Sequence, residues 1–121
     1  MDNISILNCD SYEMMWFFEK IPIIDRNNYL VIFDDISDGS HVLNIAFNFV
    51  LNAVDLSIYH LEQRILYCEY EGISKMRIDN DQIGDYLTFE VELKDLSVLS
   101  LVVRIKPYIS IQTSRLRSHS E

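Results

Sequence analysis

Residues 43–59 read LNIAFNFVLNAVDLSIY, and apolar and polar side chains alternate along most of this stretch. Leu43, Ile45 and Phe47 fall on one side of an extended chain, because successive strand side chains point to opposite faces. Asparagines fall on the other side. The pattern predicts two half-buried strands, at residues 43–51 and 54–58.

The same alternation recurs along the chain at intervals of about ten residues. Asp34, Asp35 and a turn at residues 37–40 are expected to break the first strand. Repeated short strands predict a mainly β (α+β) fold, an antiparallel sheet or sandwich with one short N-terminal helix. The remaining strands are predicted at residues 29–33, 65–71, 73–78, 87–93, 99–105 and 109–111.

The N-terminal helix is predicted over residues 11–20. Asp10 suits the N-cap position, Glu13 follows three places later, and Pro22 stops the helix. The apolar run at residues 14–18 is expected to pack in the core, with a hydrophobic partner surface as the less favoured alternative.

Length and cysteine content indicate a single domain that needs no disulfide. We expect residues 1–112 to form one globular domain and residues 113–121 a polar C-terminal tail. Cys9 and Cys68 are isolated thiols without a CxxC pair, so they are predicted to be buried and reduced. One disulfide between them is the less favoured alternative.

Residues 79–90, DNDQIGDYLTFE, offer two interpretations. A calcium-binding loop needs oxygen ligands at its first, third, fifth and twelfth positions, but the fifth position is Ile83, which has no side-chain oxygen. The flank from Tyr86 onward alternates as a strand. Asn80, Asp81 and Gly84 are turn formers. We therefore predict a hairpin whose acidic turn adjoins the Glu90 and Glu92 side chains and creates a negative patch without a metal.

The chain is acidic, with 19 acidic against 10 basic residues and a formal net charge of −9. Residues 1–103 carry −12, and residues 104–121 carry +3. Such a field repels nucleic acid and anionic lipid and speeds encounter with a basic partner. Solubility alone is the simpler explanation.

No pattern in the sequence supports catalysis or a bound cofactor. His41, His60 and His119 lack metal-binding spacing, and no nucleophile elbow, phosphate-binding loop or dinucleotide fingerprint occurs. Glu69 and Glu71 would form a like-charged row on a strand, either as a solvated face or as a face awaiting a cationic partner. We expect no enzymatic activity, metal or cofactor.

The N-terminus does not resemble a signal peptide, since it lacks a basic segment and carries an acid before its first apolar run. No apolar run approaches the ~20 residues of a membrane span. The expected location is the cytoplasm, without membrane contact.

Residues 17–47 resemble the opening of the Immunity protein 50 family of bacterial polymorphic-toxin systems. The resemblance lies in a helix ending in Phe18-Glu19-Lys20-Ile21-Pro22, a strand at residues 29–36, the turn Asp38-Gly39, and a second strand with Leu43, Ile45 and Phe47. It implies a small, acidic, non-catalytic protein that binds a cognate toxin domain and neutralises it. The sequence leaves its oligomeric state open.

A nuclease toxin would offer a basic substrate cleft that an acidic face can occlude, with no direct contact to nucleic acid. Affinity would come from buried aromatic anchors, for which Tyr59, Tyr70 and Tyr86 are candidates. Two alternatives stay open: a phage-encoded acidic inhibitor that mimics nucleic acid, and a small β-scaffold ligand-binding protein or enzyme. The predicted acidic contacts are Asp34, Asp35, Asp38, Asp79, Asp81, Asp85, Glu90 and Glu92.

Overall fold

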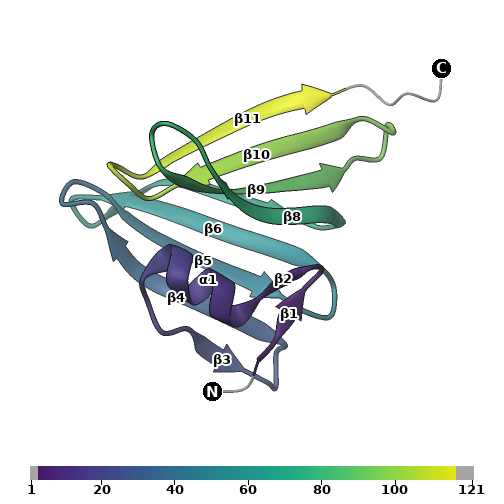
Figure 1. Cartoon of the computed structure of the whole chain (residues 1–121), viewed down its shortest axis with the longest axis horizontal. Helices are drawn as coiled ribbons and strands as arrows, with labels where there is room; N and C mark the ends of the chain where they lie inside the picture. The colour runs from purple at the N-terminus through teal and green to yellow at the C-terminus, as the bar shows by residue number, and fades with distance from the viewer. Residues whose placement is uncertain (1–2, 117–121) are drawn as a thin grey trace.

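A computed structural model describes residues 3–116 as three antiparallel sheets and one helix, which confirms the predicted fold class. The four-stranded sheet lies above the five-stranded sheet, and α1 lies across one face of the latter (Figure 1). The elements in chain order are β1 (Ser5–Ile6), β2 (Cys9–Asp10), α1 (Ser11–Phe18), β3 (Ile23–Asp25), β4 (Leu30–Ser37), β5 (Val42–Asn48), β6 (Ala53–His60), β7 (Gln63–Tyr70), β8 (Ile73–Asn80), β9 (Asp85–Glu92), β10 (Val98–Arg104) and β11 (Ser110–Leu116).

The five-stranded sheet has the order β3-β4-β5-β6-β7, and the alternating stretch at residues 43–59 supplies its central hairpin, β5–β6. The first strand of this hairpin is shorter than predicted. It ends at Asn48, whose side-chain oxygen accepts hydrogen bonds from the amides of Val50 and Leu51. Such an Asx turn competes with strand pairing, so the last two apolar residues lie exposed in the turn.

β4 does not break at Asp34 and Asp35, so that prediction was wrong. A β-bulge between Phe33 and Ile36 accommodates the extra residue and lets pairing with β5 continue to Ser37. Asp35 takes a left-handed backbone there, with φ of 54°, and its amide donates to the Asn44 side-chain oxygen at 2.8 Å.

The four-stranded sheet has the order β11-β10-β9-β8 and consists of consecutive antiparallel hairpins. Its last strand corrects the predicted tail: β11 pairs with β10 as far as Leu116, because polar residues suit an edge strand whose outer side meets water. Residues 117–121 of the predicted tail, with His119, lie outside the described residues.

Helix α1 begins at Ser11 with Asp10 as its N-cap, as predicted, and the Asp10 carboxylate accepts the Glu13 amide at 2.8 Å. It ends two residues early, because Glu19 adopts a left-handed C-cap conformation with φ of 55°. Met14, Phe17 and Phe18 are buried as expected, whereas Trp16 is 80% exposed and corrects that part of the prediction.

One hydrophobic core joins both sheets and the helix. Phe18 of α1 packs on Phe33 of β4 with ring centroids 4.6 Å apart, while α1 also contacts β8 and β9 of the other sheet. Cys9 is buried in this core as a free thiol, and Cys68 is half-buried and also free, so no disulfide joins them. Burial raises the pKa of the Cys9 thiol to about 12, and Glu13 and Asp10 add to the rise.

Candidate acidic binding surfaces

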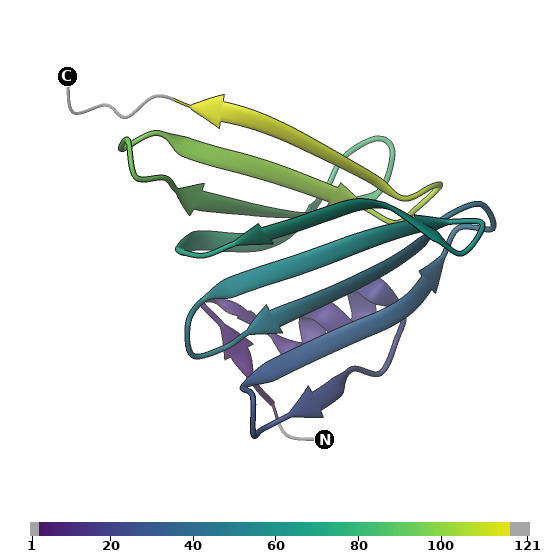
Figure 2. The ribbon, with the colours of Figure 1, turned by 180° about the vertical axis from the view of Figure 1, so that it is seen from behind.

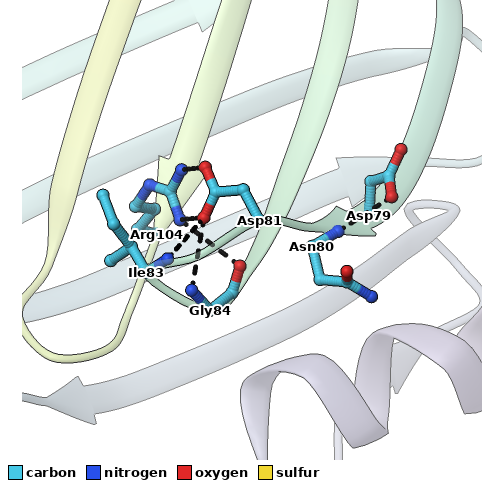
Figure 3. Close-up of polar contacts among 6 residues, drawn as sticks. All are labelled: Asp79, Asn80, Asp81, Ile83, Gly84 and Arg104. Carbon is cyan, nitrogen blue, oxygen red and sulfur yellow. Dashed lines mark hydrogen bonds and ion pairs between the residues drawn. The ribbon is translucent and has the colours of Figure 1, made fainter.

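The turn of the β8–β9 hairpin is built around Asp81, in agreement with the hairpin interpretation of residues 79–90. The Asp81 carboxylate accepts the backbone amides of Ile83 and Gly84 at 2.9 and 3.2 Å, and both of its oxygens bind the Arg104 guanidinium (Figure 3). The Arg104 hydrogen bond, followed by the turn amides, lowers the pKa of Asp81 below its usual value. This carboxylate therefore holds the turn.

Other acids of the four-stranded sheet also have basic neighbours. Glu90 lies 4.0 Å from the Lys75 amine across the β8–β9 pair, and Asp79 lies 3.6 Å from the Arg77 guanidinium. Tyr86 lies beneath Arg104, 4.9 Å from its guanidinium carbon. The four-stranded sheet thus carries interleaved charges rather than the continuous negative patch expected from the sequence.

Three more of the predicted contacts are Asp85, Glu92 and Asp38, and their surroundings differ from those of the paired acids. Asp85 and Glu92 stand at the two ends of β9 and form no ion pair within residues 3–116. Asp38 is different, because its side chain is only 2% exposed and lies at the β4–β5 turn. Whether any of these residues contacts a partner stays a prediction.

The Asp38 carboxylate links the two sheets. It accepts the amides of Ser40 and His41 at 2.8 and 2.6 Å in its own turn, and the amide of Ile109 at 2.8 Å from the loop before β11. Burial by itself would raise its pKa, but the hydrogen bonds from His41, Ile109 and Ser40 outweigh burial and leave the pKa below its usual value. Its role in the fold is structural.

A second acidic surface lies on the outer face of the five-stranded sheet, which is the face opposite α1. No other element of the described chain covers this face (Figure 2). Asp55 of β6 and Glu69 of β7 are directly opposite each other in the strand pairing, and Asp34 follows the alternation of β4 onto the same face. None of the three forms an ion pair within residues 3–116.

The two facing carboxylates border a surface hollow of about 370 Å³. Burial raises the pKa of the Asp55 carboxyl, and the nearby Glu69 charge raises it further. Like charges that face each other across two strands destabilise a sheet, so this pair costs folding free energy. The hollow is lined by Leu30, Ala46, Asn48, Ala53, Val54, Asp55, Glu69, Tyr70 and Glu71.

Tyrosines flank the facing carboxylates. Tyr67 of β7 is exposed, and its hydrogen bond with Glu69, with smaller effects from burial and nearby acids, raises its pKa to about 12. The Arg64 guanidinium carbon lies 4.6 Å from the Tyr67 ring centroid. Of the predicted anchors on this sheet, Tyr59 is half-buried and Tyr70 packs partly against the core.

The charge count of each sheet separates the two surfaces, and the sequence alone contains this signal. Residues 23–71, which contain β3 to β7, carry eight acids and two bases, a net charge of −6. Residues 73–116 carry six acids and six bases, a net charge of zero. Counting charge over residues 1–103 and 104–121 hides this difference, because that division separates Arg104, Lys106 and Arg115 from the acids of the same sheet. Asp55 and Tyr67 were missed as site residues for the same reason.

Two further observations concern metals and membranes. Among residues 3–116, no three His, Cys, Asp or Glu side chains gather closely enough to hold a metal ion. The helix within this part of the chain is not long and apolar enough to cross a membrane.

Comparison with known proteins gives one informative similarity. No protein-family model matches the chain, and no curated protein sequence matches it significantly. Among solved structures, it is similar to a chain of a contact-dependent growth inhibition toxin–immunity protein complex from Klebsiella pneumoniae 342. The TM-score is 0.78 at 26% sequence identity, and the match covers 87% of this chain and 92% of that chain. The narrower resemblance to the Immunity protein 50 family stays a prediction.

Proposed function

We propose that this chain is an immunity protein that binds a cognate bacterial toxin domain and neutralises it. The observation that carries the proposal is the similarity, over nearly the whole of both chains, to a member of a toxin–immunity protein complex. Of the two kinds of protein in such a complex, we assign this chain to the immunity protein and not to the toxin, because no pattern in its sequence supports catalysis.

The distribution of charge supports a basic partner. The outer face of the five-stranded sheet carries acids that cost stability and form no ion pair among residues 3–116, and such a face complements a positively charged protein. A long-range field of this sign accelerates association with a basic partner, while buried contacts set the lifetime of the complex.

The finer form of the proposal is that the toxin is a nuclease. Nucleases bind phosphates through basic clefts, and an acidic surface can occupy such a cleft and exclude the substrate. The chain would act in the cytoplasm of the cell that it protects, where the toxin arrives, without binding nucleic acid itself.

Co-expression tests the proposal directly. The product of the gene adjacent to the one for this chain is induced in a bacterial host, alone and together with this chain. We expect the adjacent product to stop growth alone and to be harmless in the presence of the chain, and we expect a one-to-one complex of the purified proteins. An adjacent product that is harmless by itself contradicts the proposal.

An in vitro assay tests the finer form. The purified adjacent product is incubated with RNA or DNA, and this chain is titrated in. A nuclease predicts degradation that falls linearly to zero near one equivalent of the chain. Neutralisation in cells without any nucleic-acid cleavage in vitro would keep the immunity role and overturn the nuclease assignment.

A further inference from the structure

β7 is a long, exposed edge strand. It pairs with β6 on one side and has no hydrogen-bonded neighbour on the other within the described residues. In an antiparallel strand, the backbone amide and carbonyl of one residue point to the neighbour on one side, and those of the next residue point to the other side. About half of the backbone groups of β7 therefore face outward without a strand partner. Such an edge is a ready template for another strand.

Two of the other three edges of the large sheets, β3 and β8, are protected against strand addition. The third, β11, carries Arg115 and no acid, so it does not attract a basic segment. β3 is only three residues long, and β8 carries Lys75, Arg77 and a bulge while also contacting β2. Short edges, lysines and bulges are the devices by which proteins discourage strand addition. β7 spans eight residues and contains neither lysine nor proline. Its pairing with β6 has one irregularity, an extra residue at Ile65, and is regular from Leu66 to Tyr70.

β7 also exposes apolar surface that an added strand would cover. Ile65 is 55% exposed, Tyr67 is 45% exposed and Leu66 is 37% exposed. Leu66 and Tyr67 lie on opposite faces of the sheet, and Ile65 is the extra residue at the register shift. Both faces of the strand therefore project beyond the core. Exposed apolar residues grouped on one edge mark an interaction site more often than scattered ones do.

The charge around this edge selects the partner. Asp55, Glu62, Glu69 and Glu71 surround β7, and Arg64 is the only base on it. Arg64 is stacked on Tyr67 and forms no ion pair with these carboxylates among the described residues. An approaching strand that carries Lys or Arg at alternate positions would place one of them beside Glu69 on β7, with Asp55 one strand further in on the same face.

We propose that the toxin docks by adding an extended basic segment to the free edge of β7. The proposal rests on the proposed function and names the surface that carries it. Backbone pairing would supply affinity, Ile65 and Tyr67 would be covered by the added strand, and the acidic outer face would select a basic segment. A second copy of this chain is a poor occupant, because both copies would bring the same sheet, with eight acids and two bases over residues 23–71, to the interface.

Residue-resolved amide exchange provides the signature of strand addition. The ¹⁵N-labelled chain is measured alone and bound to the purified product of the adjacent gene. We expect exchange at alternate β7 residues to slow by more than about tenfold on binding, while the intervening amides, already bonded to β6, change less. A contact made only through side chains would not produce this alternation.

Matched lysine variants test the same edge. Ile65→Lys places a gatekeeper charge on β7, and Gln112→Lys places the same residue on β11, the edge of the other sheet, with the same change in net charge. Both positions are exposed, so both variants should fold. We expect Ile65→Lys to weaken the complex about tenfold or more and Gln112→Lys to leave the Kd within about twofold.

The outcomes separate this inference from the proposed function. If the wild-type chain does not bind the adjacent gene product, both fail. If it binds and neutralises, but β7 gains no alternating protection and Ile65→Lys binds normally, only the docking mode is overturned. Protection of β7 that appears without partner and grows with protein concentration would assign the edge to a second copy and overturn it as well.

Discussion

The two large sheets of this protein use their acidic residues in opposite ways. In the four-stranded sheet, acids and bases are equal in number, and Asp81, Asp79 and Glu90 lie beside Arg104, Arg77 and Lys75. In the five-stranded sheet, over residues 23–71, eight acids accompany two bases, and Asp55 faces Glu69 directly. One sheet neutralises its charge within the fold, and the other holds charge that the fold does not satisfy.

From this contrast we infer which acids stabilise the fold and which are candidates for binding a partner. An acid that is paired with a base inside the fold contributes to stability, and binding a toxin through that acid would break the internal pair. An acid that costs folding free energy and has no partner is retained for another reason, because local conflicts with stability tend to fall at functional sites. The outer face of the five-stranded sheet is therefore the better candidate for binding.

The largest expected effect comes from reversing one charge on each sheet. Glu69→Lys and Glu92→Lys make the same substitution with the same change in net charge, one on β7 and one at the end of β9. We expect Glu69→Lys to weaken toxin binding by about 30- to 100-fold, or about 2–3 kcal/mol, since it repels a basic partner at close range. We expect Glu92→Lys to change the Kd by less than about threefold.

Isothermal titration calorimetry against the purified adjacent gene product measures both variants, and circular dichroism checks that both are folded. The opposite order of effects would place the interface at the hairpin acids predicted from the sequence. It would also remove the distinction drawn between the two sheets.

The next effect concerns the carboxylate that joins the sheets. Asp38→Ala removes the acceptor of the Ser40, His41 and Ile109 amides, and we expect it to lower the free energy of unfolding by about 2 kcal/mol. Asp34→Ala, on the outer face of the preceding strand β4, is the control and should change stability by less than about 0.5 kcal/mol. Urea denaturation measures both. Equal effects would mean that Asp38 does not link the sheets.

The sequence predicted much of the fold but little of how its charges are distributed. Period-two alternation located the major strands, and the Asp10 and Glu13 pair located the helix start, because these signals are local. The β4 bulge was hidden, since its stabilising contact comes from Asn44 on the neighbouring strand. β1, β2 and β3 are too short to show a period.

The candidate site was harder to predict because it depends on pairing. Arg104 lies 23 residues from Asp81, and Glu69 lies 14 residues from Asp55, so neither relation appears in a local window. Only the order of strands tells which acid meets a base and which meets another acid. Counting charge separately for each predicted sheet is the part of this information that the sequence did contain.

A smaller effect follows from the facing carboxylates. Asp55→Asn removes the repulsion with Glu69, and we expect it to raise the free energy of unfolding by about 0.5 kcal/mol. Asp81→Asn should lower stability instead, since the amide cannot reproduce the two-oxygen contact with Arg104. Thermal or urea denaturation gives the two signs. If Asp55→Asn gained stability and also bound the toxin as tightly as wild type, Asp55 would have no part in the interface.

The smallest effect is the pH dependence of these two variants, and its sign distinguishes the two sheets. Asp55 has a raised pKa in the folded protein, so its contribution to stability is fully present below its unfolded pKa of about 3.9 and is lost as pH rises through the folded value. Asp81 has a lowered pKa, so its contribution is present above that unfolded value and is lost as pH falls.

Urea denaturation between pH 3 and 7 should therefore show wild type and Asp55→Asn nearly equal at pH 3, with the variant gaining its advantage above about pH 4. Asp81→Asn should develop a disadvantage over the same interval. Deviations of the same sign for the two variants would mean that the acids of both sheets are in equivalent environments, and the assignment of one surface to structure and the other to binding would have to be abandoned.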